Sequence, residues 1–329
     1  MRGCYPFKMK RRNLNLLVLP ALLRALPSLA ASRFAASVGA LAQGTRPAAQ
    51  PSPASAPPLT RRIPSTGEAI PVVGLGSWIT FNVGNDRAAR SHCADVMRAF
   101  FDAGGRLIDS SPMYGSSQGV IGEGLQTLAA PPRVLSADKV WTSSAGARQI
   151  EASRQLWRVP QFDLLQVHNL LAWEQQLPLL QSMKAAGQLR YVGITTSEGR
   201  RHRDVEQIMR SQRIDFVQLS YNLLDREAEE RLLPLARERG IAVLVNRPFR
   251  QGELLRQLQR QPLPAWAGEI DCISWAQVAL KFVISHPDVT CAIPATSSVA
   301  HVRENLAAAR GRMPDAALRK RMAEHVAAL

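Results

Sequence analysis

From residue 61 onward, short β-branched or aliphatic runs alternate with longer amphipathic stretches, and this alternation restricts the possible folds most strongly. The runs that predict strands are Val72–Leu75, Arg106–Asp109, Val134–Lys139, Asp163–His168, Tyr191–Thr195, Phe216–Tyr221, Ile241–Asn246 and Thr290–Pro294. Most of them are almost continuously apolar, which is typical of parallel strands buried on both faces. Because a helical stretch follows most strands, the sequence predicts an α/β fold around a parallel sheet.

The stretches that predict helices are Arg87–Ala103, Gln149–Trp157, Glu174–Ala186, Arg203–Arg210, Arg226–Arg239 and Trp275–Ser285. Gly104, Gly187 and Gly240 stand where helix C-caps are expected. Eight strand–helix units in roughly 270 residues are the usual size of a (β/α)8 TIM barrel. The alternative, an open doubly wound sheet, would need a G-x-G-x-x-G turn after its first strand, and residues 74–78 lack the third glycine.

Two additions to the barrel are predicted, and the barrel domain is expected to span residues 61–329. Pro64–Pro71, with Thr66-Gly67 at its centre, predicts a β-hairpin ahead of the first barrel strand, where it would close the bottom of the barrel. Met313–Leu329 predicts an extra C-terminal helix that starts near Pro314-Asp315.

The first 42 residues differ from the rest in charge. They hold seven Lys or Arg and no acid, and without them the formal charge of +15 falls to +8. Lys10-Arg11-Arg12, the apolar stretch 14–23 and Ala40-Leu41-Ala42 predict an export signal that resembles a bacterial twin-arginine signal, so that the export machinery would be a partner and the protein periplasmic. The alternative is a basic leader that is never cleaved, with the protein in the cytoplasm. Residues 43–60, rich in Pro, Ala and Ser, predict a linker.

Composition argues against several other classes of protein. No apolar run approaches the roughly 20 residues that a membrane-spanning helix needs. The four cysteines show no metal-ligand spacing, so no metal site is predicted. No arginine-rich tract or aromatic stripe indicates nucleic-acid binding, whereas the remaining excess of positive charge favours an anionic ligand such as a cofactor phosphate.

Four polar residues follow or end predicted strands, at the end of a barrel where chemistry takes place. Asp109, Lys139 and His168 each end a predicted strand, and Tyr114 follows Asp109 by five residues. Each type of residue alone is more often structural, as a cap, a packing ring or a satisfied core group. Four that converge on one barrel mouth instead indicate an active site.

In this order and spacing, Asp109, Tyr114, Lys139 and His168 resemble the catalytic tetrad of the aldo-keto reductases. Further blocks of residues 61–329 carry the same resemblance, namely 108–115, 121–125, 163–169, 187–193, Ile293-Pro294 and Arg303-Glu304-Asn305. The leader and the block 246–249 are similar to a subgroup of exported bacterial members. The resemblance implies an NAD(P)H-dependent enzyme that reduces an aldehyde or ketone to an alcohol.

In that mechanism Tyr114 is the general acid, and Lys139 lowers the pKa of its phenol. Asp109 would hold Lys139, and His168 would hydrogen-bond the substrate carbonyl. A second possibility is a catalytically weak nicotinamide-binding subunit that senses redox state. A barrel hydrolase or isomerase would need a metal cluster or paired carboxylates at strand ends, and the sequence has neither.

The resemblance also implies the cofactor and substrate contacts. The expected cofactor-binding residues are Asn169, Thr195, Thr196, Gln218, Asn246, Arg247, Thr296, Ser297, His301, Glu304 and Asn305, and the expected substrate-pocket residues are Trp78, Met113, Trp141 and Leu170. The alternative for Thr296 and Ser297 is simple helix capping. NADP(H) is favoured over NAD(H), although Ala295 and His301 stand where NADPH-preferring members often carry Lys and Arg. Asn246 stands where many members stack an aromatic ring on the nicotinamide.

Overall fold

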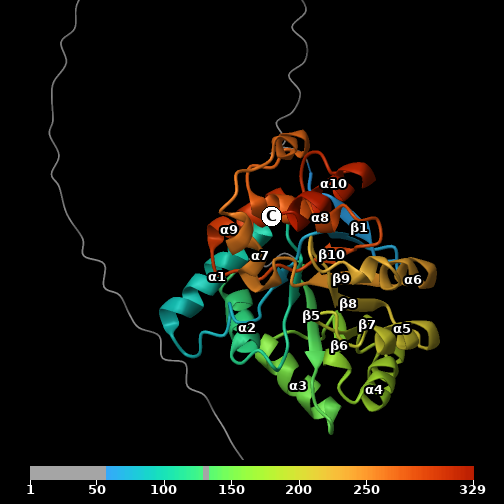
Figure 1. Ribbon diagram of the computed structural model, residues 1–329. Helices are drawn as coiled ribbons and strands as arrows, with labels where there is room; N and C mark the ends of the chain where they lie inside the picture. Colours follow the sequence, from blue (N-terminus) through green and yellow to red (C-terminus); the bar gives the residue numbers. More distant parts are fainter. Residues whose placement is uncertain (1–56, 129–132) are drawn as a thin grey trace, which may run out of the picture. The chain divides into compact units, whose positions relative to one another are not determined.

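The computed structural model describes residues 57–128 and 133–329 (Figure 1). The leader predicted over residues 1–42 lies outside the described residues, as does the predicted linker up to residue 56. In the described part of the chain, no helix is long and apolar enough to cross a membrane.

Eight parallel strands form one curled sheet, in which neighbours in sequence are neighbours in space. Its order is β3 (Leu75–Gly76), β4 (Leu107–Asp109), β5 (Leu135–Val140), β6 (Leu164–Val167), β7 (Tyr191–Thr195), β8 (Phe216–Ser220), β9 (Ala242–Asn246) and β10 (Cys291–Ala292). The backbone N–H of Gly74 donates to the Ala292 carbonyl, and that of Gly76 donates to the Pro294 carbonyl. The first and last strands therefore meet, which is consistent with a (β/α)8 barrel.

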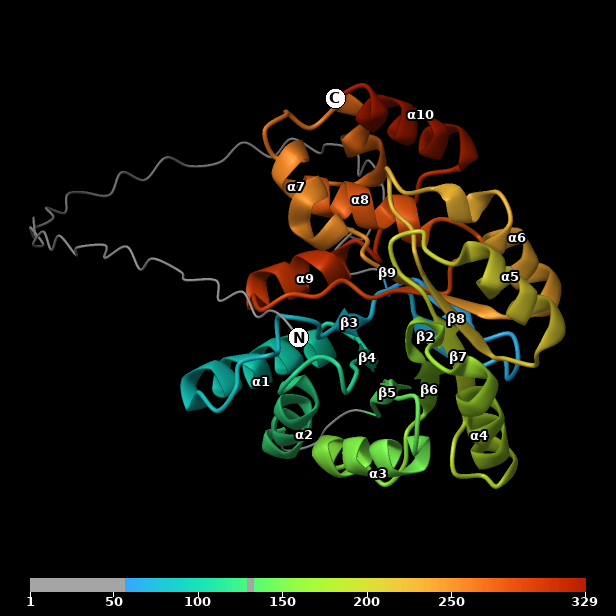
Figure 2. The same cartoon turned by 60° about the horizontal axis from the view of Figure 1, so that its bottom comes forward.

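Helices cover the outer face of this sheet, as Figure 2 shows. Between strands lie α1 (Arg87–Asp102), α2 (Ser117–Thr127), α3 (Gly146–Trp157), α4 (Trp173–Ala185), α5 (His202–Ser211), α6 (Leu232–Arg239), α7 (Glu253–Leu258) and α8 (Trp275–Ile284), and β10 is followed by α9 (Val299–Ala307) and α10 (Ala316–Ala327). Asp86 and Asp315 cap α1 and α10 by accepting backbone N–H groups of the first turn. Gly104, Gly187 and Gly240 have positive φ at helix ends, as the sequence predicts.

Some predicted boundaries are wrong. The predicted helix Arg226–Arg239 is interrupted, because a short 3-10 turn at Glu227–Glu229 precedes α6, which begins at Leu232. Pro234 has no N–H to donate to residue 230, so a continuous helix would lose a hydrogen bond there, whereas the first turn of a new helix loses none. The first barrel strand begins at Leu75 rather than at Val72, since Val73 makes only an isolated bridge to Ala292.

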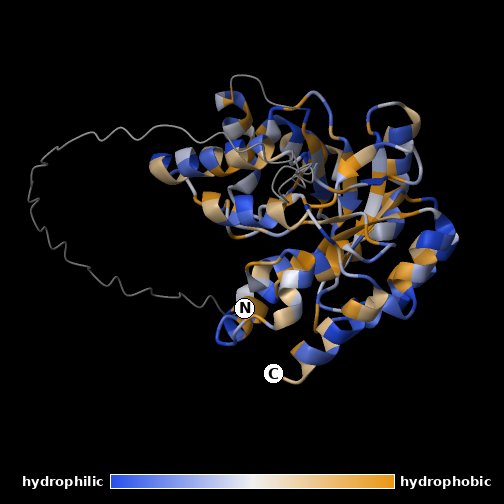
Figure 3. Ribbon diagram, turned by 90° about the horizontal axis from the view of Figure 1, so that it is seen from above, coloured by the Kyte–Doolittle hydropathy of each residue, from blue (hydrophilic) through white to orange (hydrophobic). Residues whose placement is uncertain are grey.

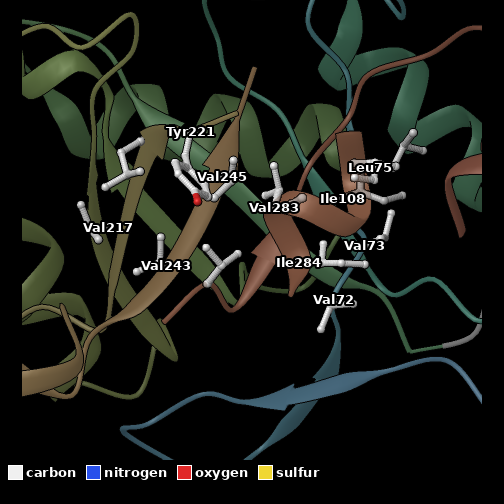
Figure 4. Packing of buried hydrophobic residues seen from close by; sticks show 14 of the residues in the cluster. Val72, Val73, Leu75, Ile108, Val217, Tyr221, Val243, Val245, Val283 and Ile284 are labelled. Carbon is white, nitrogen blue, oxygen red and sulfur yellow. The ribbon is translucent and has the colours of Figure 1, made fainter. Parts of the chain in front are cut away.

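Apolar side chains form a core on each side of the sheet. Figure 3 shows strands that are mostly hydrophobic inside helices of mixed character. The outer cluster lies between strands and helices, and Figure 4 shows Val243 and Val245 with Val283 and Ile284 of α8. The inner cluster joins alternate residues of the strands, among them Leu107, Leu135, Leu164, Phe216 and Leu244, and so fills the barrel.

A two-stranded antiparallel sheet precedes the barrel. It is formed by β1 (Thr60–Arg62) and β2 (Ala69–Pro71). Ile63 and Ile70 are fully buried and belong to the inner cluster. These two side chains thus pack with the inward-facing residues of the strands, and the polar residues described next line a cavity.

Candidate active site

Asp109 and Lys139 form a buried ion pair at the carboxyl ends of β4 and β5. The Lys139 Nζ lies 2.5 Å from Asp109 Oδ2 and donates to the Ser110 carbonyl at 2.7 Å. Burial by itself lowers the pKa of Lys139, but the neighbouring Asp109 and Tyr114 outweigh it, so the pKa lies above its ordinary value. Lys139 therefore carries a positive charge inside the site at neutral pH.

The second oxygen of the Asp109 carboxylate is held by two amides. Gln218 Nε2 donates to Oδ1 at 2.9 Å, and Gln166 Nε2 donates to it at 3.3 Å. We expected Gln218 to bind cofactor but did not single out Gln166. A buried Gln in the middle of an otherwise apolar strand is the signal that could have identified it.

Tyr114 lies in the loop between β4 and α2, with the Lys139 Nζ 5.0 Å from its ring centroid. Burial raises the pKa of the phenol, the charge of Lys139 and its hydrogen bond lower it, and Asp109 raises it, with a net upward shift. Lys139 thus lowers the pKa of the phenol, as the sequence predicts, but desolvation outweighs this effect and the net shift is upward. At neutral pH Tyr114 carries its proton, and Lys139 provides the local charge that favours its departure.

His168 follows β6 and is 6% exposed. Its ring stands edge-on to Tyr114, with centroids 5.7 Å apart and planes at 87°. Burial, followed by the charge of Lys139, lowers the pKa of His168 to about 3. The imidazole is therefore neutral at physiological pH and has one N–H to donate. Its Nδ1 lies 2.8 Å from Ser111 Oγ, a neighbour that our sequence analysis missed.

A cavity of about 660 Å³ connects these groups with residues near α9. Its wall includes Asp109, Tyr114 and His168, together with the predicted residues Trp78, Met113, Asn169, Thr195, Gln218, Asn246, Arg247, Thr296, His301, Glu304 and Asn305. The loop after β3, the ends of the strands and the start of α9 thus contribute to one space. Such a position, at the carboxyl ends of parallel strands, is usual for a barrel active site.

Of the predicted cofactor- and substrate-contact residues, four are not part of the cavity wall, and neither is the catalytic candidate Lys139. Thr196 is buried and donates its hydroxyl to the Arg200 carbonyl at 2.5 Å, and the following residue, Ser197, lies in the wall instead. Ser297 accepts His92 Nε2 at its carbonyl. Leu170 is buried in the outer core, and Trp141 lies beside the site with its ring 6.5 Å from that of His168.

Asn246 and Arg247, in the cavity wall, differ in how far the protein satisfies their polar atoms. Asn246 is held between strands, because its Nδ2 donates to the Thr196 carbonyl at 2.9 Å and its Oδ1 accepts from Ser220 at 2.6 Å. Arg247 Nη1 contacts Glu198 Oε1 at 2.5 Å, while its buried Nε has no partner among the described residues. An unsatisfied guanidinium N–H in a cavity wall matches an anionic group such as a diphosphate. Near the other end, Ser298 caps α9 by accepting from His301 N.

Asp138, the residue beside Lys139, points away from the cavity toward α2 and α3. Its Oδ2 accepts from Gln118 Nε2 at 2.6 Å, and the same amide nitrogen donates to Ser153 at 2.9 Å. The other carboxylate oxygen is buried without a partner among the described residues. Burial therefore raises the pKa of Asp138 to about 7, against the opposing effect of Lys139.

This raised pKa predicts a pH-dependent stability. The contribution of Asp138 to the free energy of unfolding is fully present below pH 3.8, the pKa of this carboxyl in the unfolded chain. It is lost as the pH rises through about 7, the pKa in the folded protein. Asp138→Asn is expected to raise the thermal midpoint at pH 8 and to change it little at pH 4. Thermal unfolding of both proteins between these pH values tests this, and equal midpoints at pH 8 would show that the carboxylate is solvated or paired.

The described residues contain no cluster of three or more His, Cys, Asp or Glu placed to hold a metal ion.

Comparison with known proteins agrees with this geometry. The model of the aldo/keto reductase family matches residues 72–320. The chain is 29% identical over 248 residues to the methylglyoxal reductase YeaE of Escherichia coli strain K12, covering 73% of this chain and 85% of that protein. It is 25% identical over 314 residues to an NADH-specific methylglyoxal reductase of the same organism, covering 77% and 94%.

A solved structure is also similar. The aldo/keto reductase from Klebsiella pneumoniae in complex with NADP and acetate superposes with a TM-score of 0.67 at 25% identity, covering 79% of this chain and 93% of that one. The family match spans Asp109, Tyr114, Lys139 and His168. The chain belongs to the aldo/keto reductase family of NAD(P)H-dependent oxidoreductases.

Proposed function

We propose that this protein reduces an aldehyde or ketone to an alcohol with NAD(P)H, and that Tyr114 is the general acid. One observation carries the proposal: a protonated phenol, a buried ammonium–carboxylate pair and a neutral imidazole lie together at one end of the cavity. Carbonyl reduction requires a hydride at carbon and a proton at oxygen, and this group of side chains is suited to donating the proton.

Each side chain has a distinct task in the proposed reaction. When bound, a dihydronicotinamide would supply the hydride, and Asn169, Thr195, Gln218 and Arg247, which line the cavity, would hold the dinucleotide. His168 donates its N–H to the carbonyl oxygen and orients it. Tyr114 donates its proton to that oxygen, and the charge of Lys139 stabilises the phenolate that remains. Asp109 keeps Lys139 charged and in place.

The substrate is proposed to be a small or apolar aldehyde or ketone. Trp78 and Met113 line the cavity and are 36% and 44% exposed, so they present apolar surface beside Tyr114. Two of the similar proteins are named for methylglyoxal reduction. Purified protein is expected to oxidise NADPH in the presence of methylglyoxal or a small aromatic aldehyde. Nucleotide binding without turnover of any carbonyl would instead support a redox-sensing subunit.

We further propose that NADP(H) is preferred over NAD(H). The support is the formal charge of +8 outside the first 42 residues, which favours a ligand with an additional phosphate. Titration of protein fluorescence is expected to give a lower Kd for NADPH than for NADH, with a difference that shrinks as ionic strength rises. Equal or tighter binding of NADH would contradict this preference.

We also propose that the complete fold is a (β/α)8 barrel with two additions. The β1–β2 hairpin would close its amino-terminal end, supported by the contact of 2.9 Å between the hydroxyls of Thr66 and Tyr191. The helix α10 would be the extra outer helix, supported by the hydrogen bond of 2.5 Å from Arg319 to the Tyr221 hydroxyl.

For localisation, we propose export to the periplasm through the twin-arginine pathway. The support is the basic triplet Lys10-Arg11-Arg12 ahead of the apolar stretch 14–23. Cell fractionation of the wild type and of a variant with both Arg11 and Arg12 replaced by Lys tests it. Equal cytoplasmic retention of both proteins would favour a cytoplasmic enzyme.

A further inference from the structure

We propose that Ser111 is a positioning residue that holds His168 in the tautomer with its proton on Nε2. The consequence for catalysis depends on the proposed function, in which His168 donates to the substrate carbonyl. The tautomer itself depends only on the contacts around Ser111 and can be measured without a substrate.

Ser111 belongs to the same loop as Tyr114, between β4 and α2, and its side chain contacts the ring of His168. Its side chain is fully buried, and its Oγ is 2.8 Å from His168 Nδ1. At this distance a hydrogen bond joins the two atoms, but either one can be the donor. The remaining contacts of the hydroxyl decide the direction.

The hydroxyl of Ser111 already accepts one hydrogen bond. The backbone N–H of Met113 donates to Ser111 Oγ at 3.2 Å, which leaves the Ser111 proton in need of an acceptor. His168 Nδ1 is the one acceptor that the described residues bring within hydrogen-bond distance of that proton. If Nδ1 carried a hydrogen instead, the buried O–H would be left unsatisfied, at a cost of about 1–3 kcal/mol. Ser111 therefore donates, and Nδ1 accepts.

A neutral imidazole whose Nδ1 accepts must carry its hydrogen on Nε2. His168 is part of the cavity wall, and no described residue is hydrogen-bonded to its Nε2. The Nε2–H is thus available to a ligand oxygen beside Tyr114. The low pKa of the ring keeps it in this neutral form at physiological pH. Ser111 consequently sets which of the two ring nitrogens is a donor in the cavity.

Nitrogen NMR of ¹⁵N-histidine-labelled protein tests this directly, since the two tautomers give different patterns of ring nitrogen signals. The sequence has six histidines, and loss of one signal set in His168→Asn assigns the ring. In the wild type we expect His168 to be neutral with its proton on Nε2. In Ser111→Ala we expect both tautomers, whereas Ser111→Thr, which keeps the hydroxyl, should retain one. Ser153→Ala is the matched control, because it removes another buried hydroxyl outside the site.

Two results would overturn the proposal: a wild-type proton on Nδ1, or an unchanged tautomer in Ser111→Ala. The tautomer of the wild type is measured without any variant, so the proposal can be tested even if Ser111→Ala fails to fold. With aldehyde and NADPH, Ser111→Ala is expected to lose about tenfold in kcat, with KM and nucleotide Kd changed less. A shifted tautomer with unchanged kcat would leave the role of Ser111 intact and contradict the role of His168 in the proposed function.

Discussion

Tyr114→Phe is expected to lower aldehyde turnover by about 10²- to 10⁴-fold, the usual contribution of a general acid. The substitution removes one oxygen and leaves the ring packed edge-on against His168. Because burial keeps the phenol protonated, its hydroxyl can serve as the proposed proton source beside the charged Lys139. Cofactor affinity should change little, since binding uses the remainder of the cavity wall. Stopped-flow turnover and fluorescence titration of nucleotide separate the two effects.

The control for this variant is Tyr191→Phe. Tyr191 belongs to the inner cluster, and its hydroxyl contacts Thr66 and Glu68 rather than the cavity. Removal of that hydroxyl should leave kcat within a few-fold of the wild type. If Tyr114→Phe retained turnover within about tenfold, which corresponds to roughly 1.4 kcal/mol, Tyr114 would not be the acid.

Lys139→Met is expected to abolish turnover and to lower the free energy of unfolding by about 3–5 kcal/mol. The methionine is similar in length but leaves the buried Asp109 carboxylate without its cation. Two amides still donate to Oδ1, yet they carry no compensating charge. Denaturant unfolding followed by circular dichroism measures the loss of stability, and NADPH oxidation measures the loss of turnover.

A double variant distinguishes these two effects. Asp109→Asn combined with Lys139→Met removes both charges, so most of the stability should return while turnover stays absent. As a control, Arg98→Met breaks a pair whose side chains are 50% and 51% exposed, and it should cost less than about 1 kcal/mol. If the single Lys139 variant were as stable as the wild type, Asp109 would not depend on Lys139 for its charge compensation.

Strand positions could be predicted from sequence because parallel strands buried on both faces appear as continuous apolar runs. The ends of the strands could not be predicted, because hydrogen bonding to neighbouring strands decides where pairing stops. At the barrel closure, Val73 forms only a single bridge although its sequence favours a strand. Close packing between helices could not be predicted from the sequence either. A Cβ at Gly122 would lie 2.0 Å from the Leu156 carbonyl, so α2 approaches α3 closely at this residue.

The four central groups of the site could be predicted because three of them stand at strand ends, where the topology brings them together. Ser111, Gln166 and Glu198 were missed, since single polar residues in loops and strands are common and the partners of these three come from distant segments. For the same reason, the sequence could not predict that Ser197 rather than Thr196 lines the cavity, because this depends on the path of the loop after β7. The net direction of the pKa shift of Tyr114 depends on how deeply the phenol is buried, and the spacing of residues in the sequence does not reveal this.

Transfer of deuterium from NADPH labelled at C4 tests the reductase assignment most directly. The purified chain would be incubated with methylglyoxal and each of the two C4-deuterated forms of NADPH, and the alcohol would be analysed by mass spectrometry. A single cavity that holds the dinucleotide beside Tyr114 and His168 in one orientation predicts one deuterium on the former carbonyl carbon from one form and none from the other. Alcohol without deuterium from either form, or no alcohol from methylglyoxal or any other carbonyl tried, would contradict the account.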